Sequence, residues 1–345
     1  MQSYNCITLG QKTPLYMKRN IIITALVSCV ALLAMSSYDA TAKNPSAKKA
    51  TKPTSTKTTS ESYASANHQI IKKLTSSSQG SYNIYTCVID GIERTYKLYL
   101  PENILPDAPL VFVLHGYGGS FNLDHVQINE TADRHGFAVC YPQGSKDGRG
   151  KNCWNVGYPF QADMKVDDVS FLCTLAKHLQ QQHSLSRRNT FCTGMSNGGE
   201  MCYLLAYDKQ KCFAAVAPIA GLTMEWMPRH YTRTRPIPLF EVHGTEDRVS
   251  EWTGDLDNKG GWGAYIAVPD AVEYWVRRNK CANTESITLP LKSSDAHTVI
   301  AHKHTAGRRG TEVWLYEVVG GGHTWATKDI DTAEEIWLFF SRFVK

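Results

Sequence analysis

The sequence predicts an α/β domain with a mainly parallel central sheet over residues 81–345. Short apolar segments alternate along the chain with segments of helical periodicity, which is typical of an α/β architecture. At least one segment, Leu110–Leu114, is apolar throughout, as in strands that helices cover on both faces. The chain has 345 residues, of which 42% are hydrophobic, so it can bury a large core.

The first element is an antiparallel hairpin, because two strand-like runs, Tyr82–Ile89 and Arg94–Leu100, flank the turn signal Asp90-Gly91. Periodicity and composition then predict the alternating elements. Further strands are expected at Leu110–Leu114, Phe137–Tyr141, Asn189–Cys192, Phe213–Ile219, Ile237–Val242 and Val313–Val318. Helices are expected at Leu123–Arg134, Val166–His183, Asn197–Tyr207, Pro269–Arg278 and Thr332–Val344.

Residues 1–42 have the pattern of a secretory signal peptide. Lys18-Arg19 form a positive region, Ile21–Met35 is an uncharged apolar run, and a small-x-small site predicts cleavage after Ala42. The apolar run is short for a membrane-spanning helix, which needs about 20 residues. We therefore expect a secreted or periplasmic protein with no transmembrane span.

Two alternatives remain at this end of the chain. Met17 is a candidate for the true start residue, and Cys29 lies in a sequence that resembles a lipoprotein box. The apolar run continues past Cys29, where a lipoprotein would turn polar, so lipid anchoring is the less favoured reading.

Residues 43–80 are rich in Lys, Ser, Thr and Ala and contain few large apolar residues, which predicts a flexible linker. Of the net charge of +5, residues 1–80 hold +8, which leaves 81–345 at −3. The folded part is thus slightly acidic, and its charge gives no indication of nucleic-acid binding.

Eight of the ten cysteines follow the leader. Export would permit disulfides, but Cys140, Cys173, Cys192 and Cys202 lie in segments with the pattern of buried strands or helices, where a free thiol packs as a small apolar group. No pairing follows from the spacing. The absence of a C-x-x-C motif removes the signature of a thioredoxin-like site or a zinc ribbon.

The central motif is Gly194-Met195-Ser196-Asn197-Gly198, a G-x-S-x-G sequence. An apolar strand precedes it and a helical segment follows it. A nucleophilic serine needs such a strand–turn–helix, with glycines that let the backbone turn tightly. The motif predicts that Ser196 is a nucleophile, with a glycine-rich turn of no catalytic role as the alternative.

A serine hydroxyl needs a base to act as a nucleophile at neutral pH. His323 lies on a glycine-rich turn after the last expected strand, where the base belongs in the chain order serine–acid–histidine. Asp247 follows strand Ile237–Val242 and can orient the imidazole, with Glu246 and Glu251 as rivals for that role.

The transition state also needs oxyanion donors. We expect the backbone N–H of Asn197 to be one, and the N–H of Tyr117, or alternatively Gly116, to be the other. The side chain of His115, in the same loop, is interpreted as structural rather than as a base.

His302 and His304 form an H-x-H pair that a strand would point to one side, but no third ligand is evident nearby. Neither glycine-rich loop matches a phosphate-binding motif. The sequence implies no metal and no organic cofactor.

With these residues identified, the chain resembles the secreted polyhydroxybutyrate-depolymerase-like esterases, which include the feruloyl and acetyl-xylan esterases of carbohydrate esterase family one. The resemblance runs from about Tyr82 to Lys345 and implies an α/β-hydrolase fold, with nucleophile, acid and base at Ser196, Asp247 and His323. It rests on seven blocks in order, residues 114–119, 153–155, 166–169, 194–199, 213–217, 243–247 and 321–325.

The chain departs from the family at three places. Ser250 stands where the family often has proline, Trp325-Ala326-Thr327 stands where it often has Trp-Pro-Gly, and no cysteine follows Cys281 to pair with it. The triad is unaffected, whereas the disulfide that many members have here is in doubt.

Four tryptophans are candidates for substrate contact, since aromatic rings can stack on a phenolic acid or a sugar; core packing is the alternative. They are Trp154, Trp252, Trp262 and Trp325.

The sequence thus predicts a serine esterase that works through an acyl-enzyme, with feruloyl or acetyl esters on plant cell-wall xylan as the expected substrates. Alternatives are a polyhydroxyalkanoate-type depolymerase, a peptidase of the same fold, and a carbohydrate-binding protein without catalysis.

Overall fold

The computed structural model describes residues 72–76, 82–208 and 210–345. Contacts divide the chain into two units, Met1–Ser62 and Tyr63–Lys345, and the described residues all belong to the second. The expected signal peptide and most of the expected linker lie outside the described residues. The boundaries of the three predicted regions therefore stay predictions.

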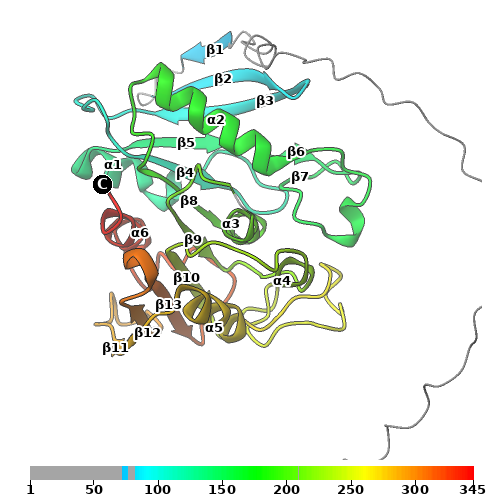
Figure 1. Cartoon of the computed structure of the whole chain (residues 1–345), viewed down its shortest axis with the longest axis vertical. Helices are drawn as coiled ribbons and strands as arrows, with labels where there is room; N and C mark the ends of the chain where they lie inside the picture. Colours follow the sequence, from blue (N-terminus) through cyan, green and yellow to red (C-terminus); the bar gives the residue numbers. More distant parts are fainter. Residues whose placement is uncertain (1–71, 77–81, 209) are drawn as a thin grey trace, which may run out of the picture. The chain divides into compact units, whose positions relative to one another are not determined.

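An eleven-stranded sheet forms the centre of this unit, in the order β1-β2-β3-β5-β4-β8-β9-β10-β13-β12-β11 (Figure 1). Six neighbouring strands, from β5 to β13, are parallel, and antiparallel strands extend the sheet at both sides. The strands of this sheet are β1 Lys72–Ser76, β2 Tyr82–Ile89, β3 Ile92–Tyr99, β4 Leu110–Leu114, β5 Ala138–Pro142, β8 Thr190–Met195, β9 Ala215–Ile219, β10 Leu239–Gly244, β11 Asn283–Thr288, β12 Thr298–Thr305 and β13 Val313–Val319. A separate two-stranded sheet pairs β6 Ser145–Lys146 with β7 Asn152–Cys153.

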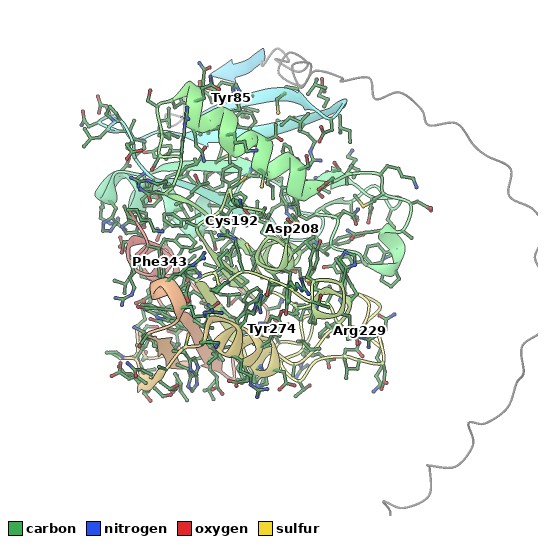
Figure 2. All side chains as sticks on the ribbon, in the orientation of Figure 1. Tyr85, Cys192, Asp208, Arg229, Tyr274 and Phe343 are labelled. Carbon is green, nitrogen blue, oxygen red and sulfur yellow. The ribbon has the colours of Figure 1, made fainter. Side chains whose placement is uncertain are left out.

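Helices cover both faces of the sheet, as predicted. One apolar layer includes Leu172 and Trp275, from α2 and α5, and the other includes Ile128 and Phe340, from α1 and α6. Figure 2 shows the side chains that fill the space between helices and sheet. The helices are α1 Ile128–His135, α2 Asp168–Gln182, α3 Asn197–Tyr207, α4 Trp226–His230, α5 Val268–Asn279 and α6 Thr332–Ser341, with short 3-10 turns at Asp124–Val126, Pro159–Gln161 and Arg308–Gly310.

The predicted α/β-hydrolase architecture, with its N-terminal hairpin, is confirmed, and two additions extend the sheet. Residues 72–76, which the sequence placed in the flexible linker, form β1 and pair with β2. At the other side, β11 and β12 continue the sheet beyond β13. Both additions pair the backbone groups of a strand that would otherwise form an open edge.

The parallel strands place their carboxyl ends at one edge of the sheet, where loops carry functional residues in open α/β sheets. β8, β10 and β13 lie close together in the order β8-β9-β10-β13. The loops after these three strands contain the predicted triad. None of the helices in the described part of the chain has the length and apolar character of a membrane-spanning helix.

Candidate active site

Ser196 stands on a tight turn between β8 and α3, with φ 56° and ψ −124°. Positive φ is unfavourable for a serine, and such strain is found where a structure holds a reactive side chain in place. The two flanking glycines are needed for close packing. A Cβ on Gly194 would lie 2.7 Å from the carbonyl oxygen of Gly198, and one on Gly198 would lie 2.5 Å from that of Leu114. The structure thus has the strand–turn–helix that the motif requires.

His323 and Asp247 are joined by a hydrogen bond of 2.7 Å between Nδ1 and Oδ2. Asp247 is buried, and its Oδ1 accepts hydrogen bonds from the N–H groups of Val249 and Ser250, both at 2.8 Å. Burial alone would raise the pKa of the Asp247 carboxyl. The hydrogen bond and charge of His323, with the two backbone donors, outweigh burial, so the pKa is lowered. Asp247 is therefore held as a carboxylate against one nitrogen of His323.

The rival carboxylates do not share this environment. Glu246 and Glu251 are both exposed, and the hydrogen bond to His323 comes from Asp247. An exposed carboxylate orients a histidine poorly, because water competes for both partners. The geometry therefore favours Asp247 as the acid.

Strand register brings Ser196 to the same edge as this pair. Met195 at the end of β8 pairs with Ile219, Ile219 pairs with Val242, and Gly244 at the end of β10 pairs with Val318 of β13. Within the described part of the chain, Asp247 and His323 share a hydrogen bond, whereas the Ser196 hydroxyl has no hydrogen-bond partner. Such catalytic hydrogen bonds are often long in unliganded enzymes and shorten when substrate binds.

The loop after β4 lies directly against the nucleophile. A Cβ on Gly116 would be 3.3 Å from Cβ of Ser196 and 3.8 Å from its Oγ. In this loop the N–H of Gly118 donates to Asn152 O at 2.7 Å, and the N–H of Gly119 donates to Gly116 O at 3.0 Å. Gly116 and Tyr117 thus remain the candidates of the loop for the oxyanion hole.

The second candidate donor is the backbone N–H of Asn197, which is the first residue of α3. The first N–H groups of a helix have no partner inside it, and the helix dipole favours negative charge there. This placement suits an oxyanion that forms beside Ser196.

His115 holds the oxyanion loop in shape. It is buried, its Nδ1 bonds to Gly116 O at 2.7 Å, and its Nε2 accepts the N–H of Gly144 at 3.0 Å. Burial lowers the pKa of the imidazole. With both ring nitrogens engaged in the protein, His115 is structural.

Part of the chain is similar to a known protein family. Residues 94–227 match the model of the family described as "Esterase PHB depolymerase". This part of the chain is thus similar to the esterase domain of that family. The matched segment includes the oxyanion loop and the Ser196 turn, while Asp247 and His323 lie beyond it.

Two curated relatives are longer proteins. A bifunctional acetylxylan esterase/xylanase of Neocallimastix patriciarum is 29% identical over 255 residues, which cover 73% of this chain and 34% of that protein. Feruloyl esterase B of Piromyces equi is 26% identical over 222 residues, which cover 63% of this chain and 39% of that protein. The chain thus spans little more than a third of the length of these two relatives.

The solved structure of an acetyl xylan esterase from Aspergillus awamori is similar to this chain with a TM-score of 0.50 and 13% identity. The match covers 79% of this chain and 99% of that one. This likeness shows the fold, which is the α/β-hydrolase fold.

Two of the four predicted substrate-contacting tryptophans are in the core, and the prediction for them is wrong. Trp154 is fully buried, and its indole N–H donates to His115 O at 2.9 Å. Trp325 is 6% exposed and packs in the layer with α1 and α6. Large aromatic side chains gain most from burial, and a motif does not reveal which ones are covered.

The other two, Trp252 and Trp262, are partly buried. The ring of Trp252 lies 6.0 Å from that of His243. The ring of Trp262 lies 5.4 Å from Tyr117 and 5.3 Å from Tyr158. Because Tyr117 belongs to the oxyanion loop, the Trp262 cluster lies beside the site.

The sequence missed a buried pair beneath Asp247. Glu241 and His243, both on β10, are joined at 2.8 Å, and Nε2 of His243 lies 2.8 Å from Ser250 O and 3.6 Å from Oδ2 of Asp247. Burial raises the pKa of the Glu241 carboxyl despite its hydrogen bond to His243. The alternation of side chains along β10 is the signal that could have placed both residues on one face.

His302 and His304 lie on β12, as a strand pair should. His302 bonds to Ser286 and Glu317, and His304 bonds to Thr284. Within the described ranges, no three His, Cys, Asp or Glu side chains are grouped as metal ligands.

Proposed function

We propose that the protein is a serine esterase that hydrolyses carboxylic esters through an acyl-enzyme. The observation that carries the proposal is the Asp247–His323 hydrogen bond of 2.7 Å at the sheet edge where Ser196 stands on its strained turn. The esterase family match of residues 94–227 supports the same chemistry.

In this reaction Nε2 of His323 takes the proton of Ser196, whose oxygen attacks the ester carbonyl. The N–H groups of Asn197 and of Tyr117 or Gly116 stabilise the oxyanion. The alkoxide leaves with the proton from His323, and the acyl group stays on the serine. Water, activated by the same histidine, then releases the acid.

The proposed substrates are feruloyl or acetyl esters on plant cell-wall xylan. The names of the two relatives support this class. So does the aromatic cluster, in which Tyr117, Tyr158, Phe160 and Trp262 have ring centroids 5.1–6.5 Å apart. Tyr158 is buried, whereas Tyr117, Phe160 and Trp262 are partly exposed and give a surface beside the oxyanion loop that suits a planar acyl group or a sugar ring. The family description favours a second candidate, a polyhydroxyalkanoate-type ester.

The test is hydrolysis of methyl ferulate, acetylated xylan, a hydroxybutyrate oligomer and a short p-nitrophenyl ester by wild type and by Ser196→Ala. We expect the variant to lose at least about a thousandfold in kcat. The preferred ester then identifies the substrate class. If wild type cleaves none of them, or if Ser196→Ala retains its rate, the proposal is wrong.

Export is part of the proposal. It is supported by the charge, apolar run and small-x-small site of residues 1–42 in the sequence. N-terminal sequencing of the protein recovered from outside the cytoplasm should begin at Lys43. A start at Cys29 would instead indicate a lipoprotein.

A further inference from the structure

A cavity of about 790 Å³ lies along α2, at the end of α3, away from the triad. Asp208, labelled in Figure 2, ends α3 beside it. The lining residues Lys177 and Lys211 are exposed, so the cavity opens to solvent as a groove. The residues that line the cavity all belong to the described part of the chain, and they do not include Ser196, Asp247 or His323.

Two cysteines from different segments meet in the wall of this groove. Cys173 lies on α2, and Cys212 lies shortly before β9. Sγ of Cys212 is 3.9 Å from the carbonyl oxygen of Cys173, and the two thiols share a hydrogen bond. Cys212 is partly exposed, whereas Cys173 is 8% exposed. One thiol is therefore accessible, and the other lies directly behind it.

The charges around Cys212 favour its thiolate. The hydrogen bond from Cys173, together with the charges of Lys177 and Arg235, lowers the pKa of the Cys212 thiol to about 7 against the effect of burial. Asp208 acts in the opposite direction on Cys173. A thiolate that is stabilised by cations and reachable by solvent is the form that reacts with disulfides.

We propose that Cys173 and Cys212 form a reactive dithiol site that becomes a disulfide by exchange with a small disulfide compound entering the groove. The site lies outside the esterase machinery, so the proposal does not depend on the proposed function.

The reaction has two exchange steps. The Cys212 thiolate attacks one sulfur of the small disulfide, forms a mixed disulfide and releases one thiolate. Cys173 then gives up its proton to solvent and attacks Sγ of Cys212, which releases the second thiolate. Two electrons pass from the protein to the small disulfide, which is reduced to two thiols, and the new bond joins α2 to the segment before β9.

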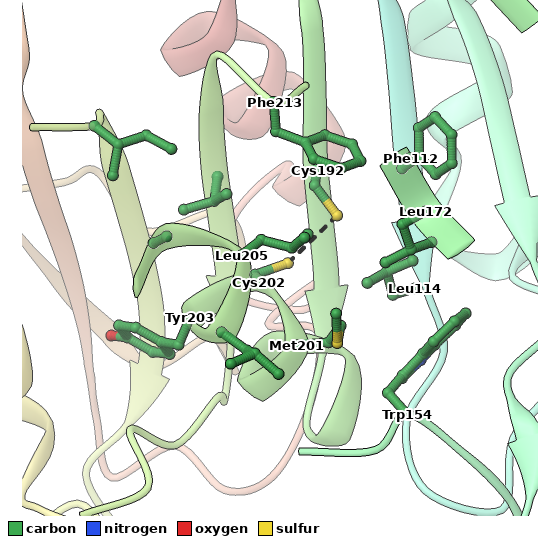
Figure 3. Packing of buried hydrophobic residues seen from close by; sticks show 14 of the residues in the cluster. Phe112, Leu114, Trp154, Leu172, Cys192, Met201, Cys202, Tyr203, Leu205 and Phe213 are labelled. Carbon is green, nitrogen blue, oxygen red and sulfur yellow. Dashed lines mark hydrogen bonds between the residues drawn. The ribbon is translucent and has the colours of Figure 1, made fainter. Parts of the chain in front are cut away.

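The chain contains a second close pair that serves as a control. Sγ of Cys202 lies 3.8 Å from Sγ of Cys192. Figure 3 shows the two side chains pointing toward each other. Both residues are fully buried, between β8 and α3, and burial raises the pKa of Cys202 well above its usual range. In both pairs the two thiols lie close together. Only in the groove pair is one thiol, that of Cys212, both reachable by solvent and stabilised as a thiolate.

Cys281 is the matched single thiol. It is partly exposed, like Cys212, but burial raises the pKa of its thiol to about 11. At pH of about 7.5 we expect the exchange rate of Cys212 to exceed that of Cys281 at least about tenfold.

The experiment treats the folded full chain with glutathione disulfide, alkylates the remaining thiols, and maps the peptides by mass spectrometry. We expect a Cys173–Cys212 linked peptide, with Cys192 and Cys202 unlinked. Cys173→Ser should stop the reaction at a glutathione adduct on Cys212, and Cys212→Ser should give neither product at this site.

Two results would overturn the proposal. One is that Cys212 reacts no faster than Cys281. The other is that the Cys192–Cys202 link forms as readily as the Cys173–Cys212 link. Far-ultraviolet circular dichroism of each serine variant establishes that it is folded, so that loss of reaction is not loss of structure.

Discussion

Replacing Asp247 with asparagine tests how the structure orients His323. The Oδ1 atom of Asp247 accepts two backbone N–H groups, from Val249 and Ser250 at 2.8 Å each. An asparagine would keep its carbonyl oxygen toward these donors, since its amide nitrogen cannot accept them. The amide nitrogen would then face Nδ1 of His323, where Oδ2 now lies at 2.7 Å.

This arrangement selects the wrong form of the imidazole. Because the amide donates, Nδ1 of His323 must accept, and the proton moves to Nε2. A protonated Nε2 cannot take the proton of Ser196. The same change in a serine-protease triad lowers kcat about 10⁴-fold, or about 5 kcal/mol in activation free energy. We expect a loss of that size in kcat for Asp247→Asn on a p-nitrophenyl ester.

The matched control is Glu334→Gln, at another histidine–carboxylate pair. Glu334 bonds to Nε2 of His135 at 2.8 Å, and His135 ends α1 just before β5, at the amino edge of the parallel strands. The Glu334 side chain is 32% exposed, so its ion pair with His135 contributes at most about 1 kcal/mol to the free energy of unfolding. If Asp247→Asn keeps more than about a tenth of kcat while it unfolds like wild type, then Asp247 does not orient the base in the way the triad requires.

Two further predictions concern the helix that follows the nucleophile. The side-chain amide of Asn197 accepts from the N–H of Trp154 at 2.7 Å and donates to its C=O at 3.1 Å. Asn197→Ala removes both hydrogen bonds and leaves these buried backbone groups unpaired. We expect the variant to lose about 1–3 kcal/mol in the free energy of unfolding, measured by urea denaturation. Asn122→Ala, at an exposed position, should be neutral, and equal effects of the two changes would contradict the reasoning. Burial raises the pKa of the Glu200 carboxyl to about 7 from 4.5, so the folded state holds a proton that the unfolded state releases. The wild type should therefore lose stability relative to Glu200→Gln as pH rises from about 4.5 to about 7, by up to about 1.4 kcal/mol per pH unit. Above about pH 7 the difference should not change further. A difference in stability that is independent of pH would refute this assignment.

The sequence predicted best the elements whose signals are local. β4 and α3 have the predicted bounds. An unbroken apolar run identifies β4, and the G-x-S-x-G motif marks the start of α3, so both signals lie within the element or next to it. β11 was missed because all six of its residues are exposed and few are apolar, so its only support is pairing with β12. A strand of that kind depends on a neighbour that periodicity cannot reveal.

The site residues also differ in whether a local motif or the folded structure identifies them. Ser196 and His323 follow from motifs, since the turns that carry them need particular residues in sequence. The choice of Asp247 over Glu246 required burial and a partner, which come from β10 and β13 lying side by side. Trp154 was assigned to substrate because a tryptophan looks the same in sequence whether it lines a cleft or fills a core.

The corrected place of Trp154 explains how the nucleophile turn and the oxyanion loop are held together. The side chain of Asn197, one residue after the nucleophile, forms two hydrogen bonds with the backbone of Trp154. The indole N–H of Trp154 in turn donates to the backbone carbonyl of His115. The His115 ring in turn bonds to Gly116, the residue whose Cα faces Ser196.

The links from Asn197 through Trp154 to His115 are buried, where hydrogen bonds are fixed in geometry and costly to break, and the last link, from His115 to Gly116, is partly buried. The relative position of Ser196 and the loop donors is thus set before any substrate arrives. Oxyanion stabilisation depends on donors that need no reorganisation during the reaction. In the proposed mechanism, a buried residue such as Trp154 would therefore contribute to catalysis by fixing the distance between the nucleophile and the groups that stabilise the oxyanion.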